Sequence, residues 1–63
     1  MKKEKTYTVN GSEYSVDIRW ENWNGKNRKG AAVYELRKSG WEFVTFLPGV
    51  YTKKEAIEWI RRI

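Results

Sequence analysis

Cysteine and histidine are both absent from the 63 residues of this chain. The lack of cysteine excludes a disulfide and a thiolate metal ligand. The lack of histidine removes the commonest general base and the commonest zinc ligand. The remaining residues show no nucleophile–base pair, no phosphate-cradling glycine loop and no set of metal ligands. We therefore expect a protein that is not an enzyme and uses no cofactor or metal.

Long apolar runs are also missing, so no segment has the length and hydropathy of a membrane span. Residues 1–5 are basic, and no apolar core follows them, which argues against a secretory signal. We expect one domain, 1–63, in which residues 1–5 form a flexible basic tail. The cytoplasm is the default compartment for such a chain.

The charge balance is the first positive indication of a partner. Thirteen Lys and Arg against eight Asp and Glu give a net charge of +5. A surplus of this size favours anionic partners, such as nucleic acid or an acidic protein surface. The same charge also serves solubility, since small soluble domains often carry a net charge of about 2–8 in magnitude. The charge therefore favours nucleic acid as a partner but does not by itself distinguish nucleic-acid binding from solubility.

The most regular pattern in the sequence is an N-terminal β-hairpin. Tyr7 and Val9 alternate with threonines, and Asn10-Gly11 is a strong signal for a type I′ turn. The alternation resumes over residues 12–21. A two-residue turn places the apolar residues of both strands on one face, which supports this assignment.

The rest of the chain predicts a loop, two strands and a helix. Residues 22–30, rich in Asn, Gly and basic side chains, are expected to form an exposed loop. Strands are predicted over 31–38 and 41–47, with a tight turn at Ser39-Gly40 between them. Thr52 and Glu55 have the spacing of a capping box, which predicts a helix from about residue 53 to the C-terminus. Its expected buried stripe is Ala56, Ile57, Ile60 and Ile63.

The fold class is therefore α+β, a three- to four-stranded antiparallel β-meander packed on one C-terminal α-helix. Two registers of its second half remain open. The favoured register places one apolar set under the helix: Tyr34, Leu36, Trp41, Phe43 and Leu47. The pairing of Lys38 with Trp41 places this set on one face in either case. The register is favoured because the opposite choice would put Glu35, Arg37 and Glu42 on the helix side, where burial is costly.

The alternative register follows if Asn24-Gly25 is itself a two-residue turn. Ile18 would then pair with Ala31, and Val16 with Val33. The aromatic side chains of residues 34–43 would lie on the open face of the sheet. Such a face resembles a stacking platform for nucleic acid.

The candidate nucleic-acid residues come from the basic loop and from the strands. In the loop, one tryptophan stands among three cations, which can contact phosphates while the indole stacks on a base. The strands add further basic and aromatic positions. The full candidate set is Arg19, Trp23, Lys26, Arg28, Lys29, Arg37, Lys38 and Trp41.

The favoured register also predicts a surface for a protein partner. It places Val33, Val44 and Phe46 on the open face as an apolar island among charged residues. An exposed apolar island suggests a protein contact or a homodimer.

The C-terminal part of the chain resembles a known family. A strand over residues 41–46 precedes Tyr51-Thr52-Lys53-Lys54-Glu55-Ala56 and Trp59. This arrangement resembles the N-terminal arm-type DNA-binding domains of tyrosine recombinases and the related AP2-type plant DNA-binding domains. The resemblance implies a three-stranded sheet that packs on one C-terminal helix and enters the DNA major groove.

Carried onto this chain, the resemblance implies that strand residues lie nearest the DNA, namely Arg19, Arg37, Lys38 and Trp41. It implies flanking phosphate contacts for Lys26, Arg28 and Lys29. The chain departs from the family in its added N-terminal strand and in the acid-rich open face of the favoured register.

The expected function is that of a small nucleic-acid-binding protein. Duplex DNA is the first expected partner, held through phosphate contacts and through sheet or loop residues by a monomer or weak homodimer. The alternative is a small phage or mobile-element protein that binds a protein partner, as inhibitor or adaptor, through the apolar island and the basic loop.

Overall fold

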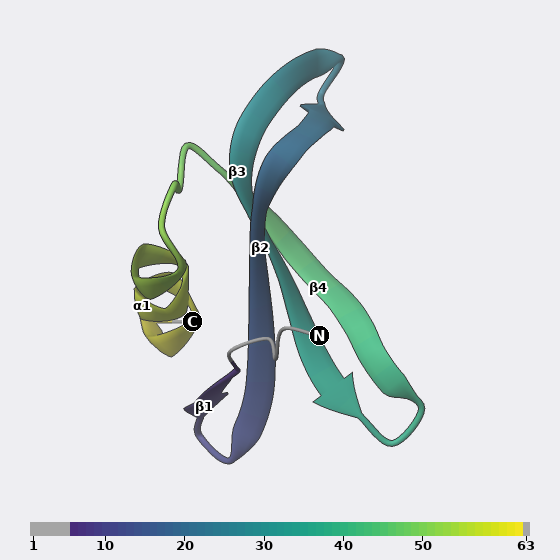
Figure 1. Ribbon diagram of the computed structural model, residues 1–63, viewed down its shortest axis with the longest axis vertical. Helices are drawn as coiled ribbons and strands as arrows, with labels where there is room; N and C mark the ends of the chain where they lie inside the picture. Colours follow the sequence, from purple (N-terminus) through teal and green to yellow (C-terminus); the bar gives the residue numbers. More distant parts are fainter. Residues whose placement is uncertain (1–5, 63) are drawn as a thin grey trace, which may run out of the picture.

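The computed structural model describes residues 6–62, which form four strands followed by one helix. The elements are β1 (Tyr7–Val9), β2 (Ser12–Trp23), β3 (Lys26–Arg37), β4 (Gly40–Pro48) and α1 (Lys53–Arg62). The strands form one antiparallel sheet in chain order, and α1 lies against one face of it (Figure 1). This confirms the predicted α+β meander. The predicted tail at residues 1–5 and the predicted buried Ile63 lie outside the described residues.

The Asn10-Gly11 turn forms as predicted. Asn10 and Gly11 have φ angles of 51° and 82°, in the left-handed region that a type I′ turn requires. Tyr7 pairs with Tyr14 across the turn. Val9 is buried as a result, which ties the short strand β1 to the core.

The predicted loop over residues 22–30 is wrong, because this segment is a second hairpin of the same kind. Asn24 and Gly25 have φ angles of 54° and 80°, close to those of the first turn. β2 and β3 pair continuously from Trp23 and Lys26 at the turn to Tyr14 and Glu35 at the far end. The polar composition was misleading, since this end of the hairpin is exposed and needs few apolar residues.

The register that forms is the alternative one, and the favoured register is wrong. Val16 pairs with Val33, and both lie in the core that α1 covers. Because successive side chains of a strand point to opposite faces, Tyr34 lies on the face away from the helix. We call this face, opposite α1, the open face.

The desolvation argument for the favoured register fails because α1 is short. Its 10 residues span about 15 Å and pack on β1, β2 and β3. Arg37 and Glu42 are on the helix side of the sheet but beyond its end, with side chains 54% and 45% exposed. The third residue, Glu35, is 19% exposed, and its carboxylate contacts the Arg37 guanidinium at 2.8 Å. Two charges therefore stay in water and the third is paired, which avoids most of the expected burial cost.

The turn between β3 and β4 is one residue earlier than predicted. Arg37 pairs with Gly40 and Leu36 with Trp41, which leaves Lys38 and Ser39 at the turn. Lys38 is therefore not paired with Trp41. The two pairings differ by two residues along β3, so the face on which Trp41 lies is unchanged.

A β-bulge in β4 decides the orientation of its aromatic residues. Val33 pairs with Thr45 and Tyr34 with Phe43, which leaves Val44 as the extra residue. The bulge changes the alternation along β4. As a result Phe43 and Phe46 both lie on the open face, although they are three positions apart and regular alternation would put them on opposite faces.

Phe46 points to the open face of the sheet but is covered there by another side chain. It is only 3% exposed, it pairs with the fully buried Ala32, and its ring centroid lies 5.4 Å from that of Trp23. The predicted apolar island is therefore wrong. Val33 is covered by the helix, Phe46 is covered by Trp23, and Val44 remains at 42% exposure.

The helix begins and packs as predicted. The backbone N–H of Glu55 donates to Thr52 Oγ1 at 3.2 Å, which is the first half of the capping box. Ala56, Ile57 and Ile60 are buried, and they join a core made with Val9, Val16, Ala31, Val33 and Val50. Within residues 6–62, no helix is long and apolar enough to cross a membrane.

Removing the cap should destabilise the fold without changing it. We expect Thr52→Ala to lower the free energy of unfolding by about 0.5–2 kcal/mol, since the Glu55 N–H loses its acceptor. Thr52→Ser keeps the oxygen and should retain most of the stability. Urea melts followed by circular dichroism measure both, and equal stability of the Ala variant and the parent would refute the cap.

The two phenylalanines of β4 should differ sharply in their effect on stability. Phe46→Ala should cost about 3–5 kcal/mol, because it opens a cavity between Ala32 and Trp23. Phe43 is 55% exposed and contacts Tyr34 edge-on, so Phe43→Ala should cost less than about 1.5 kcal/mol. Thermal melts of the two variants compare them, and similar losses would contradict the observed bulge.

Candidate nucleic-acid interface

One end of the β2–β3 hairpin extends past the rest of the sheet. The pairing of β3 with β4 stops at Gly30 and Pro48, whereas β3 continues to pair with β2 as far as Lys26. Residues 20–29 therefore form a two-stranded ribbon at the end of the molecule that is uppermost in Figure 1. We call these residues the ribbon end.

Gly30 fixes the base of the ribbon end against β4. A Cβ at this position would lie 2.4 Å from the Leu47 carbonyl oxygen and 2.8 Å from Pro48 Cα, so only glycine fits there. Next to it, the Gly49 N–H donates to the Lys29 carbonyl at 3.0 Å. The ribbon end is thus held on the sheet at its base, and near its turn the Trp23 ring packs on Phe46 of β4.

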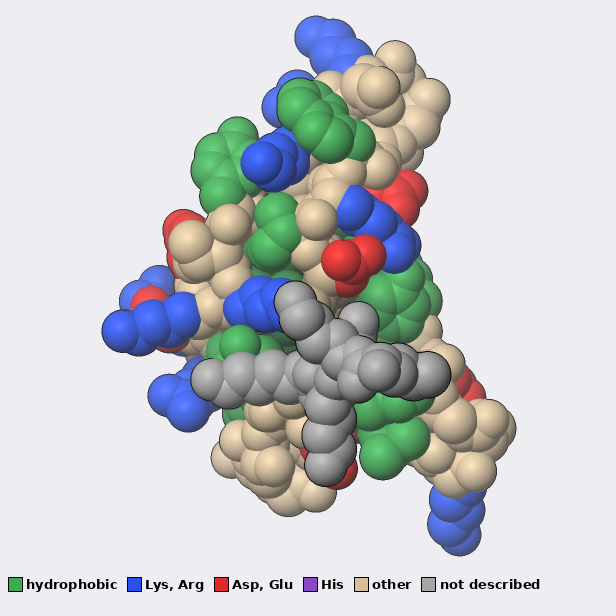
Figure 2. Space-filling view, viewed as in Figure 1, with side chains coloured by type: hydrophobic (Ala, Val, Ile, Leu, Met, Phe, Trp, Pro, Cys, Tyr) green, Lys and Arg blue, Asp and Glu red, His purple; other side chains and the backbone are tan. Residues whose placement is uncertain are grey.

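The ribbon end carries mainly basic, amide and aromatic side chains. Its cations are Lys26, Arg28 and Lys29, and its asparagines are Asn22, Asn24 and Asn27. Its single acid, Glu21, accepts a hydrogen bond from Arg19 Nε at 2.5 Å and is neutralised locally. On the face shown in Figure 2, basic and apolar side chains lie next to one another at this end. The composition suits a phosphate-rich ligand.

A hollow of about 320 Å³ lies where the ribbon end meets the start of the helix. Its described lining residues are Trp20, Asn27, Arg28, Lys29, Pro48, Gly49 and Tyr51, none of which is acidic. Lys29 Nζ lies 5.9 Å from the centre of the Tyr51 ring, while Trp20 is 63% exposed. Cations beside exposed rings match the needs of a sugar–phosphate backbone and its bases.

The sequence singled out Trp23 as the stacking indole, but the structure gives Trp23 another position. Its ring packs on Phe46, so one side of the indole is used within the fold. The exposed indole of the ribbon end is Trp20, and its neighbour in the hollow is Tyr51. Alternation predicted Trp20 on the helix side, as observed. The sequence did not indicate that the helix is too short to cover this end of the sheet, which is why Trp20 is exposed.

Arg19 is in a different situation from the cations of the ribbon end. Its guanidinium contacts Asp17 Oδ2 at 3.2 Å as well as Glu21, and it lies 5.6 Å over the Tyr34 ring. Hydrogen bonding to Tyr34 and Glu21 raises the pKa of Arg19 above its ordinary value. Arg19 is therefore a charged residue already engaged on the open face, with less freedom to contact a phosphate.

Arg37 is also engaged, at the opposite end of the sheet. Its guanidinium contacts Glu35 at 2.8 Å and Glu42 at 3.2 Å. Hydrogen bonding to Arg37 lowers the pKa of Glu35, and Glu35 in turn raises the pKa of Arg37. A strand rise of about 3.3 Å per residue puts Lys29 and Arg37 roughly 26 Å apart along β3.

The predicted site residues therefore divide into two groups. Lys26, Arg28 and Lys29 share the ribbon end. Arg37, Lys38 and Trp41 lie at or beside the β3–β4 turn, at the far end of the sheet. They do not form one surface with the ribbon end.

Comparison with protein-family models, with curated proteins and with solved structures finds no match to this chain.

Proposed function

We propose that the protein binds nucleic acid, with duplex DNA as its partner, through the ribbon end. The observation that carries the proposal is the exposed two-stranded ribbon with three cations and one acid that Arg19 neutralises. The net charge of +5 favours the same class of partner. So does the sequence resemblance to DNA-binding domains that place a sheet in the major groove.

The shape of the ribbon end suits a groove of duplex DNA. A major groove about 12 Å wide admits a two-stranded β-ribbon. Lys29 and Trp20 face the helix side, whereas Lys26 and Arg28 alternate to the other side, with Arg28 also at the border of the hollow. Cations on both sides of an inserted ribbon can reach the phosphates of both strands that border the groove.

The side chains at the centre of the ribbon end can contact bases. Asn22 and Asn27 face each other across the two strands. An asparagine amide pairs with the N6 and N7 edge of adenine, and an arginine such as Arg28 pairs with guanine O6 and N7. The ribbon end therefore combines general phosphate contacts with groups that can distinguish base pairs.

A protein partner is the competing interpretation. The specific observation in its favour is the exposed apolar side chains of the open face, Leu36, Trp41 and Phe43, which are 42%, 45% and 55% exposed. These residues lie away from the ribbon end. A test that isolates the ribbon cations therefore separates the two interpretations.

Replacing the three ribbon cations should reduce the salt dependence of DNA binding. The logarithm of the affinity for duplex DNA falls with the logarithm of salt concentration, with a slope of about −0.9 per phosphate contact. The triple variant Lys26→Ala, Arg28→Ala and Lys29→Ala should make this slope shallower by about 2–3 units. Fluorescence anisotropy with random duplexes at several salt concentrations is the measurement.

A matched control removes the same charge elsewhere. The triple variant Lys54→Ala, Arg61→Ala and Arg62→Ala takes three exposed cations from α1 and should leave most of the slope in place. Both variants should keep the circular dichroism spectrum of the parent. Lack of binding to duplexes at low salt, or equal loss in the two triple variants, would overturn the proposal and favour a protein partner.

A further inference from the structure

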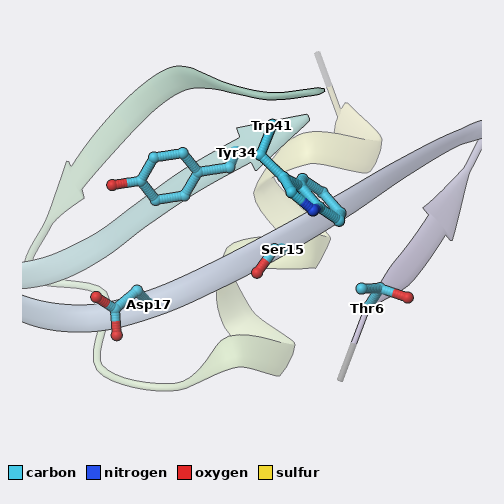
Figure 3. Close-up of a pocket in the computed structure, with 5 residues that line it drawn as sticks. All are labelled: Thr6, Ser15, Asp17, Tyr34 and Trp41. Atoms are coloured by element: carbon cyan, nitrogen blue, oxygen red, sulfur yellow. The ribbon is translucent and has the colours of Figure 1, made fainter. Parts of the chain in front are cut away.

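The open face of the sheet contains a hollow of about 410 Å³, separate from the one at the ribbon end. It is lined by Thr6, Ser15, Asp17, Tyr34 and Trp41 (Figure 3). Two aromatic rings therefore meet one carboxylate and two aliphatic hydroxyls. Small-molecule sites commonly have volumes of about 300–1,000 Å³, aromatic walls and a few polar groups that fix orientation.

The register of the sheet creates this hollow. Ser15 pairs with Tyr34, and Asp17, two residues further along β2, lies on the same face as Ser15. Trp41, from β4, is 45% exposed and extends over β2. In Figure 3 the Trp41 ring lies above Ser15, the Tyr34 ring extends toward the end where Asp17 lies, and Thr6 lies at the other end.

The aromatic walls favour a planar ligand, and the carboxylate favours one that donates hydrogen bonds. Unpaired bases are recognised by stacking on aromatic side chains and by hydrogen bonds to their Watson–Crick edges. The ionised carboxylate of Asp17 has two acceptor oxygens and no donor. Guanine presents two adjacent donors on that edge, N1–H and the N2 amino group. Adenine and cytosine present one amino group each, and uracil flanks its single N–H with two carbonyl oxygens.

Aromatic rings beside a carboxylate can also bind an organic cation. Here Arg19 already supplies the positive charge, since its Nη1 lies 3.2 Å from Asp17 Oδ2 and its guanidinium lies 5.6 Å over Tyr34. A second cation would meet the charge of Arg19. A neutral base avoids this repulsion. The contact with Arg19 also restrains the Asp17 carboxylate before any ligand arrives.

We propose that this hollow binds one unpaired guanine base. The base stacks on the Trp41 indole with the Tyr34 ring beside it, and its N1–H and N2 amino group donate to the Asp17 carboxylate. The Ser15 hydroxyl lies at the centre of the hollow and can donate to a ring acceptor. This site does not require the duplex contacts of the ribbon end, and it can be tested separately from them.

Guanosine, which has no phosphate, is the appropriate probe because the basic side chains of the ribbon end have little affinity for it. In a ¹H–¹⁵N NMR titration, guanosine should shift the Trp41 indole N–H more than adenosine, cytidine or uridine does. Inosine lacks the 2-amino group and should bind more weakly than guanosine. Asp17→Asn should weaken guanosine binding about tenfold, since a good bidentate contact is worth roughly 5- to 150-fold. The Asp17 side chain is 59% exposed, so this variant should fold.

Trp41→Ala and Trp59→Ala provide a matched pair, because the two indoles are 45% and 48% exposed. The first should abolish guanosine binding and the second should leave it unchanged. The triple variant of the ribbon cations should bind guanosine normally, so failure of the duplex proposal would not affect this test. Equal affinity for all nucleosides, or no effect of Asp17→Asn, would overturn the guanine site. Preferential binding of tetramethylammonium would show a cation site instead.

Discussion

The two-residue turn at Asn24-Gly25 determines most of this structure. A turn of two residues fixes which side chains of β2 and β3 face each other, and a shift of one residue would reverse every side chain of β3. Pairing Val16 with Val33 brings both to the core under the helix. The same pairing sends Tyr34 to the open face. The core, the open-face hollow and the ribbon end all follow from this one register.

The length of the helix is the second constraint. Ten residues cover β1, the middle of β2 and part of β3, and the remaining sheet must be stabilised in other ways. On the open side, Trp23 returns from the ribbon end and covers Phe46. This contact, together with the close approach at Gly30, holds the hairpin against β4. The uncovered surfaces that remain are the ones to which we assign function.

Local signals in the sequence were sufficient to predict most of the elements, but not the second hairpin turn, which was predicted as a loop over residues 22–30. The Asn10-Gly11 turn, the alternation of β2 and the Thr52 cap each depend on neighbouring residues, and all were predicted correctly. The face of β3 and β4 was not, because that choice depends on how far the helix extends. The cost assigned to burying Glu35, Arg37 and Glu42 assumed three unpaired charges under the helix. The side chains of Arg37 and Glu42 are instead half exposed, and the less exposed Glu35 carboxylate is paired with Arg37.

The candidate site was predictable only in part for a related reason. The three ribbon cations lie within four consecutive residues, 26–29, so their clustering did not depend on the fold. The burial of Phe46 depended on the bulge at Val44, which breaks the alternation that placed Phe46 on an exposed island. The exposure of Trp20 and Tyr51 depended on the end of the helix. The spacing of residues in the sequence predicts neither the bulge that buries Phe46 nor the position of the helix that leaves Trp20 and Tyr51 exposed.

The net charge of +5 is unevenly distributed over the surface, because some cations are paired with carboxylates and others are not. Among the described residues, the ion pairs are made by Arg19 and Arg37, each of which contacts two carboxylates on the strands. These contacts pair most of the acidic side chains of the sheet with arginines of the same sheet, namely Asp17, Glu21, Glu35 and Glu42. The cations of the ribbon end take part in none of them and remain available to a ligand. Arg19 thus connects both proposals, since it neutralises Glu21 beside the ribbon cations and restrains Asp17 in the hollow on the open face.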